Sequence, residues 1–188
     1  MKPEEKITGD GTKELIVFKL GAEEFGADIM QIREISKLMD ITRVPGAPSF
    51  IDGVINLRGK ITPIINLRKK LGFKPKEPGP DTRIIIAELD GHPVGMIVDE
   101  VTDVMKIPTK KIVPAPELVT SETSRRYLKG VGKVGKKRLI ILLDLEKVLS
   151  NEEFIDTGKV EEKAAMSSEI RRGTPKETTK PAEGEPGF

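Results

Sequence analysis

The sequence predicts an all-β protein made of two small, similar β-barrels packed together, with short helices. Two apolar runs flank Arg58 and Gly59 within residues 53–67. Their β-branched residues suit a half-buried strand, and Gly59 can take the positive φ of a tight turn, so this stretch predicts a β-hairpin. A shift of 69 residues also aligns the chain with itself, since Leu20 and Gly26 recur as Leu89 and Gly95. Each copy offers about five short strands, which close economically into a small barrel.

Composition sets the broad class of the protein. Its 188 residues, 37% of them hydrophobic, can form one large or two small cores. A net charge of +2 from 32 basic and 30 acidic residues gives a mixed surface. The absence of cysteine excludes disulfides and thiolate zinc sites and agrees with a cytoplasmic protein. No apolar run is long enough to span a bilayer, and the first residues lack the apolar region of a signal peptide.

The first copy covers about residues 14–76 and follows a polar lead-in, residues 1–13, which we expect to be flexible. Within it, 15–20 and 25–29 are predicted strands. Ile29, Ile32, Ile35 and Leu38 are spaced by three, which indicates a short helical or 3₁₀ passage. Residues 67–71 predict one helical turn.

The second copy covers about residues 83–150, after the Pro- and Gly-rich link 74–80, which should be exposed. Two barrels this rich in Ile and Val should share an apolar contact, and exchange of strands between them is possible. Residues 145–154 predict a longer C-terminal helix that ends the domain, 14–154. The polar residues 155–188 predict a disordered tail, since they cannot bury enough apolar surface.

Three sequence patterns could indicate a nucleotide, catalytic or metal site, but each is better explained by ordinary structure. The glycines of 130–135 match a dinucleotide-binding string, but a strand rather than a helix follows them, so a hairpin is favoured. His92 is the single histidine and lies in a turn, so neither a histidine metal site nor a Ser-His pair can form. Asp99, Glu100 and Asp103 could hold Mg²⁺, although a solvated acidic face is favoured.

Basic clusters at 68–70, 110–111 and 136–138 could contact phosphates. Barrels that bind single strands stack bases on aromatic rings, however, and aromatic residues make up only 4% of this chain. Nucleic-acid binding therefore remains an alternative of a different class.

The comparison of the two copies singles out Arg58. Core positions agree between the copies, whereas Arg58 corresponds to the region 133–135, which has no arginine. A purely structural residue should recur in both barrels. We therefore interpret Arg58, with Glu34 as its partner, as a binding site, against the alternative of an ordinary surface ion pair.

Several stretches closely resemble the CheW family of chemotaxis coupling proteins, from about residue 14 to 154. These stretches are residues 32–35, 50–59, 63–68, 94–99 and 114–117. The resemblance implies two SH3-like barrels without catalytic activity or cofactor. It also implies an adaptor that couples chemoreceptors to the regulatory domain of the histidine kinase CheA, which has the same fold.

The resemblance further implies residues for each contact. The receptor groove between the barrels would use Ile32, Glu34, Gly53, Arg58, Val101 and Val104. A second kinase contact would use Glu117 and Leu118, where the family often has an aromatic residue in place of Leu118. The adaptor would be cytoplasmic, recruited to receptor arrays at the membrane without inserting into it, and would bind no nucleic acid.

Three alternatives stay open. One is a CheW-like adaptor of a chemosensory pathway that controls something other than swimming. The others are a small-barrel nucleic-acid binder and a Mg²⁺ enzyme with an acidic site.

Overall fold

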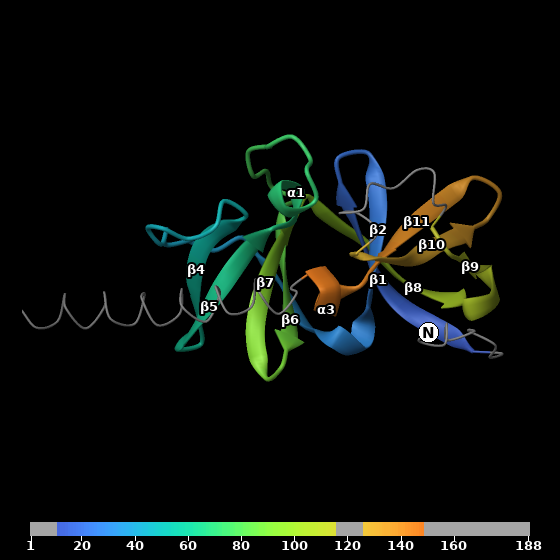
Figure 1. Ribbon diagram of the computed structural model, residues 1–188, viewed down its shortest axis with the longest axis horizontal. Coiled ribbons are helices and arrows are strands. Elements are labelled where there is room, and N and C mark those ends of the chain that lie inside the picture. The colour runs from blue at the N-terminus through green and yellow to red at the C-terminus, as the bar shows by residue number, and fades with distance from the viewer. Residues whose placement is uncertain (1–10, 116–125, 149–188) are drawn as a thin grey trace, which may run out of the picture.

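The computed structural model describes residues 11–115 and 126–148, which form two packed β-sheets and a few short helices (Figure 1). Residues 1–10 of the expected lead-in and the whole expected tail, 155–188, lie outside the described residues. Within the described part, the all-β class and the two packed β-units are confirmed.

The first sheet, sheet A, holds six strands in the described chain. In spatial order they are β8 (Glu100–Pro108), β1 (Thr12–Leu20), β2 (Glu23–Asp28), β11 (Arg138–Leu143), β10 (Leu128–Val134) and β9 (Ile112–Val113). The edge strands β8 and β9 are consecutive in the chain and are joined by the 3₁₀ helix η2 (Thr109–Lys111). Because one short turn joins the two edges, the sheet is rolled rather than flat.

The second sheet, sheet B, holds five strands. In spatial order they are β3 (Ile32–Lys37), β6 (Arg83–Leu89), β7 (His92–Val98), β5 (Lys60–Asn66) and β4 (Ile51–Leu57). Each sheet therefore mixes both copies of the repeat: β1 and β2 lie with strands of the second copy, while β6 and β7 lie with strands of the first. Parallel pairs β2–β11 and β5–β7 join the exchanged hairpins to their sheets.

The two sheets repeat each other down to their irregularities. The β4–β5 register shifts between Ile51 and Gly53, and the β10–β11 register shifts between Leu128 and Gly130. Equivalent bulges at equivalent glycines agree with the duplication read from the sequence.

The core has three parts. Leu15, Val17 and Ile140 belong to a cluster inside sheet A, and Ile64 and Ile84 belong to one inside sheet B. The largest cluster draws on both sheets, through residues such as Phe18, Phe25, Ile65, Ile85, Met96 and Leu143. Figure 1 shows the two groups of strands side by side with α3 (Leu145–Val148) between them. Strands such as β1 contribute to both kinds of cluster, which explains why both of their faces are apolar.

The spacing of three from Ile29 to Leu38 predicted a helical passage, and this prediction is wrong over most of its length. Only Ile29–Gln31 is helical, as the 3₁₀ helix η1, and the strand β3 follows. The β3–β6 register shifts between Ile32 and Glu34. The extra residue of a bulge moves every later side chain to the other face, so Ile32 and Ile35 share a face although they are three residues apart.

Other local predictions from the sequence agree with the described structure. The expected helical turn is α1 (Leu67–Lys70), in which the Asn66 side chain accepts a hydrogen bond from the backbone N–H of Lys69. The glycine-rich string 130–135 forms the β10–β11 hairpin and no phosphate-binding turn before a helix. The expected C-terminal helix is described from Leu145 to Val148, both of them buried, and its remaining residues lie outside the described chain.

Candidate functional site

The site begins with the turn that joins β4 and β5. Arg58 and Gly59 both have positive φ, 50° and 84°, which is the backbone of a tight two-residue hairpin. The Asn56 side chain accepts a hydrogen bond of 2.7 Å from the Gly59 N–H and closes the turn. Arg58 is therefore held at the tip of a rigid hairpin.

Arg58, in the turn that follows the edge strand β4, contacts Glu34 on β3, the other edge strand of sheet B. Arg58 Nη1 lies 2.8 Å from Glu34 Oε2, and the two side chains are 77% and 25% exposed. An ion pair this open contributes about 0–1 kcal/mol, because water competes for both charges. A partner that covered the pair would lower the local dielectric and strengthen the attraction.

The apolar residues expected to line the groove lie on the edge strands β3 and β8. Ile32 is opposite Ala87 and Val101 is opposite Phe18, and both pack, half-buried, against the cluster shared by the sheets. Val104, three residues further along β8 and opposite Ile16, is 51% exposed. Val101 and Val104 thus lead along β8 from the shared core to solvent, while Ile32 packs against the same core from β3.

Position 53 requires a glycine for a structural reason. Its φ is 147°, and a Cβ at this position would lie 2.1 Å from the backbone oxygen of Thr42. Thr42 and Val54 exchange two backbone hydrogen bonds of 2.9 Å beside it. Thr42 is thus a residue that the sequence did not single out, since contact between distant backbones leaves no local pattern.

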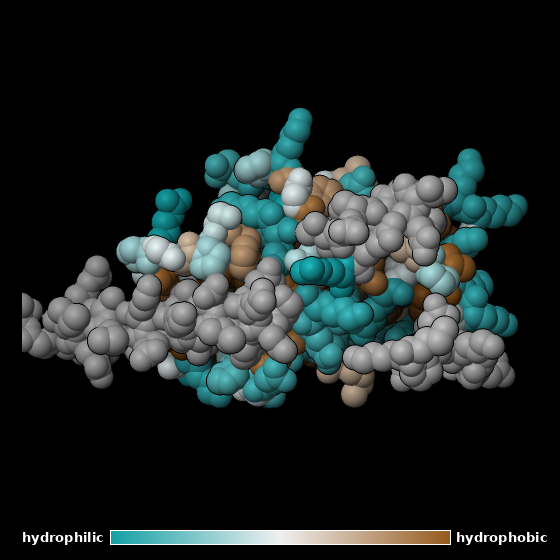
Figure 2. All heavy atoms as spheres, in the orientation of Figure 1, coloured by the Kyte–Doolittle hydropathy of each residue, from teal (hydrophilic) through white to brown (hydrophobic). Residues whose placement is uncertain are grey.

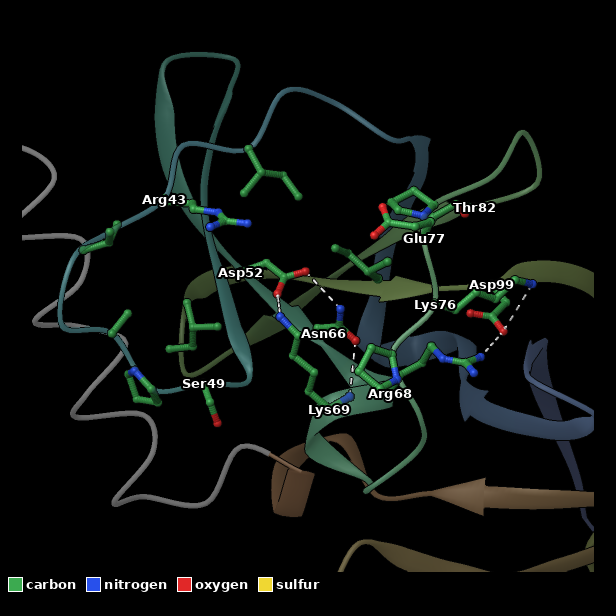
Figure 3. A pocket seen from close by; sticks show the side chains of 18 residues that line it. Arg43, Ser49, Asp52, Asn66, Arg68, Lys69, Lys76, Glu77, Thr82 and Asp99 are labelled. Atoms are coloured by element: carbon green, nitrogen blue, oxygen red, sulfur yellow. Dashed lines mark hydrogen bonds and ion pairs between the residues drawn. The ribbon is translucent and has the colours of Figure 1, made fainter.

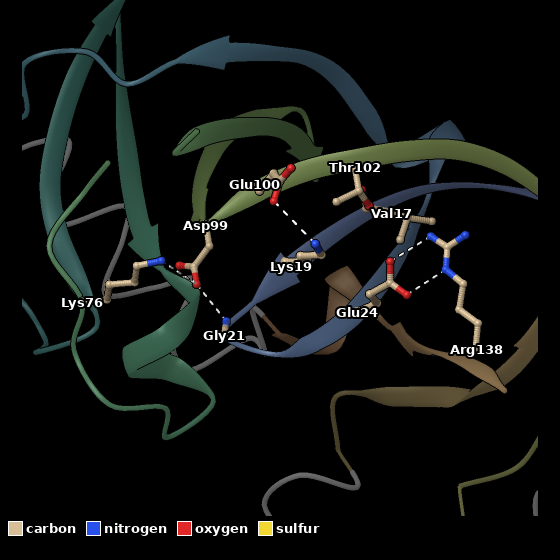
Figure 4. A network of polar contacts seen from close by, with 9 residues as sticks. All are labelled: Val17, Lys19, Gly21, Glu24, Lys76, Asp99, Glu100, Thr102 and Arg138. Carbon is tan, nitrogen blue, oxygen red and sulfur yellow. Dashed lines mark hydrogen bonds and ion pairs between the residues drawn. The ribbon is translucent and has the colours of Figure 1, made fainter. Parts of the chain in front are cut away.

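The second copy carries a related but different pair. Asp103, the counterpart of Glu34, lies 4.0 Å from Arg138 Nη1. Arg138 itself makes two hydrogen bonds to Glu24, of 2.7 and 2.8 Å (Figure 4). A carboxylate therefore recurs at this position of the repeat, but an arginine at the hairpin tip does not.

The acidic trio considered for Mg²⁺ is divided among separate cations. Asp99 pairs with Arg68 (Figure 3), Glu100 lies 3.7 Å from Lys19 (Figure 4), and Asp103 lies 4.0 Å from Arg138. In the described part of the chain, no group of His, Asp or Glu side chains is arranged to hold a metal ion.

Arg68 and Asp99 form a largely buried link between the two sheets. Their side chains are 13% and 12% exposed, and Asp99 also accepts a 2.8 Å hydrogen bond from the N–H of Gly21 in the β1–β2 turn. The Arg68 Nε donates to the carbonyl of Lys74 at 2.8 Å. This link thus holds together Arg68 after β5, Asp99 after β7 and the β1–β2 turn. The sequence did not predict this contact.

A cavity of about 670 Å³ opens beside this link, between the loop 41–49 and the linker 75–82. Its wall includes Asp52, to which Asn66 donates at 3.0 Å and Lys69 Nζ at 2.6 Å (Figure 3). The expected groove residues are not among those that line it. Glu117 and Leu118, expected at the kinase contact, lie outside the described residues.

Two further observations bear on the class of protein. Among the described residues, no helix is both long and apolar enough to cross a membrane. The duplicated sheets present the Glu34–Arg58 pair and the exposed Val104 to solvent, a mixed polar and apolar surface of the kind that protein interfaces use.

Comparison with known proteins agrees with that class. The family model of the CheW-like domain matches residues 14–153. The chemotaxis protein CheW of Klebsiella aerogenes is 40% identical over 150 residues, which cover 79% of this chain and 89% of that protein. CheW of Bacillus subtilis is 39% identical over 140 residues, 74% of this chain and 88% of its own.

A solved structure shows the same fold. The scaffolding protein CheW of Thermoanaerobacter tengcongensis matches with a TM-score of 0.69 and 36% identity, over 76% of this chain and 96% of that one. The chain belongs to the CheW family of chemotaxis scaffold proteins.

Proposed function

We propose that the protein is a non-enzymatic adaptor that couples chemoreceptors to the histidine kinase CheA. It would work in the cytoplasm, at receptor arrays on the membrane, without inserting into the bilayer. The receptor tip would lie against Ile32, Glu34, Gly53, Arg58, Val101 and Val104, and the kinase regulatory domain would contact Glu117 and Leu118. The observation that carries the proposal is the Glu34–Arg58 pair, held on a rigid hairpin and left open to solvent.

The chemistry of the pair suits an incoming amphipathic helix. The half-buried Ile32 and Val101 and the exposed Val104 offer apolar contact. Apolar anchors would supply affinity, and the covered charge pair would fix the register of the helix. An adaptor of a chemosensory pathway that controls another response would use the same contacts, so this alternative concerns the output and not the site.

Reversal of the charge at Arg58 tests the receptor contact. Arg58→Glu places two carboxylates together and should weaken binding of a receptor cytoplasmic fragment at least about tenfold in calorimetric titration. The exchange Glu34→Arg with Arg58→Glu should regain only part of the affinity, because the receptor meets reversed polarity. Lys110→Glu, the same charge change on the 3₁₀ helix η2 between β8 and β9, serves as the matched control. Unchanged affinity in Arg58→Glu would place the receptor elsewhere.

The kinase contact has a separate test. Leu118→Ser should leave the melting temperature nearly unchanged and weaken assembly of the adaptor with the kinase regulatory domain, measured by sedimentation. A stability loss of about 2–5 kcal/mol would instead identify Leu118 as a core residue and overturn the assignment.

A further inference from the structure

The outer face of strands β9, β10 and β11 carries apolar side chains bordered by lysines. Val131 on β10 lies between Ile141 on β11 and Val113 on β9, and Lys133 lies beside Leu139. Neighbours directly opposite each other in a sheet share a face, so these residues form one surface. We name it the β9–β11 face, defined by Val113, Lys129, Val131, Lys133, Leu139 and Ile141.

The opposite side of the same strands is already occupied. Ile112, Val134 and Ile140 pack in the cluster inside sheet A, and a Cβ on Gly132 would meet Ile107. On the β9–β11 face, Ile141 packs, half-buried, against the cluster shared by the sheets, whereas Leu139 is 56% exposed and Val113 and Val131 are half-exposed. A leucine this open next to two further aliphatic residues is typical of a surface that contacts another molecule.

The three strands of the face and their turns carry charge of one sign in the described residues, whereas the neighbouring strand β2 carries the exposed Glu23 and Glu24, which is hydrogen-bonded to Arg138. Described residues between 105 and 139 include no Asp or Glu, and their cations are Lys106, Lys110, Lys111, Arg126, Lys129, Lys133, Lys136, Lys137 and Arg138. Of the four lysines on β10 and its turn to β11, none has an ion-pair partner within the described residues. The basic cluster 68–70 differs, because Arg68 and Lys69 are engaged in ion pairs.

Figure 2 shows hydrophilic side chains that project at the end of the molecule formed by β9–β11, with apolar surface between them. An apolar strip with lysines beside it on β10 matches a partner that has an apolar stripe next to carboxylates. A nucleic-acid backbone has no counterpart for the strip, and the face offers no aromatic ring on which a base could stack. The chemistry therefore favours a protein segment over a nucleic acid.

We propose that the β9–β11 face is a docking surface for an acidic amphipathic helix of a partner protein. Leucine-type side chains of that helix would cover Val131 and Leu139, and its carboxylates would pair with Lys129 and Lys133. The surface is separate from the Glu34–Arg58 pair, which lies on sheet B, so it stands whether or not the receptor contact is correct.

The test uses the full chain, labelled with ¹⁵N, and a synthetic acidic peptide of about 16 residues with leucines at helical spacing and glutamates elsewhere. Amide shifts should concentrate on β9–β11. Lys133→Glu should weaken binding at least about tenfold, and Leu139→Ser should weaken it roughly tenfold even at about 300 mM salt, where surface charges are screened. Both positions are exposed, so both variants should fold with unchanged circular dichroism.

Two matched controls separate this surface from general basicity. Lys37→Glu makes the same charge change on sheet B, and Met30→Ser removes an apolar side chain that is 87% exposed on η1. Neither should alter peptide binding. If Leu139→Ser binds as wild type, if the shifts spread over all lysines, or if a DNA duplex of equal charge binds more tightly than the peptide, the proposal is wrong.

Discussion

The backbone oxygen of Thr42 decides which residue can occupy position 53. A Cβ at 53 would approach that oxygen to 2.1 Å, and φ of 147° is itself unfavourable for an L-residue. Gly53→Ala should therefore cost about 3 kcal/mol of unfolding free energy, measured by urea denaturation. Gly79→Ala is the control, because its Cβ would meet nothing and its φ is not in the positive range. A cost below about 1 kcal/mol at Gly53 would mean that the 41–42 backbone moves aside easily.

Single residues were predictable where the two copies differ and unpredictable where distant charges meet. Arg58 was identified because its counterpart is missing, and the structure brings it to Glu34. Arg68 and Asp99 were each assigned to a local cluster of like charge, one basic and one acidic. Their largely buried pairing joins residues 31 apart. Nothing in the local sequence distinguishes an arginine that points to solvent from one that points into the protein.

Strands β2 and β11 are linked by a side-chain pair that responds to pH. Two hydrogen bonds from Arg138 hold the pKa of Glu24 below its ordinary value of 4.5, although burial of the carboxyl acts in the opposite direction. A lowered folded-state pKa stabilises the protein above the unfolded value and loses this contribution as the pH falls from about 4.5 through the folded value.

Glu24→Gln should accordingly reduce the unfolding free energy at pH 7 by less than about 1 kcal/mol, since the Arg138 side chain is 36% exposed. Its stability should also fall less steeply than that of the wild type below about pH 4.5. Thermal melts at a series of pH values compare both proteins with Glu23→Gln, an exposed neighbour. Parallel pH curves for wild type and Glu24→Gln would contradict the assignment.

Elements with local signals were found from the sequence, and elements shaped by a bulge were not. The β4–β5 hairpin follows from alternation and from Gly59. The spacing of three through Ile32 and Ile35 indicated a helix because a bulged strand and a 3₁₀ turn give the same apolar period. The bulge depends on hydrogen bonds to β6, which lies far away in the chain, so the period alone could not separate the two.

At the scale of the whole molecule, the repeat predicted two similar units but not which strands share a sheet. Strands β1 and β6 occupy equivalent positions of the repeat and both have two apolar faces, so either could complete either sheet. The sequence left exchange open because equivalent strands carry equivalent patterns. The linker 74–80 only sets how far apart the copies can lie and does not select the pairing.

Exchange makes each half of the chain incomplete. Residues 1–78 contain β1 and β2, whose sheet partners β8, β9, β10 and β11 all belong to residues 79–188. Expressed alone, each fragment should therefore lack a cooperative thermal transition, since an unpaired hairpin is marginal in water. Mixed in equal amounts, the two should regain the β-sheet circular dichroism and a single melting transition of the intact chain. Cooperative unfolding of either fragment by itself would show that its strands can pair within one copy, and that the exchanged arrangement is not required for folding.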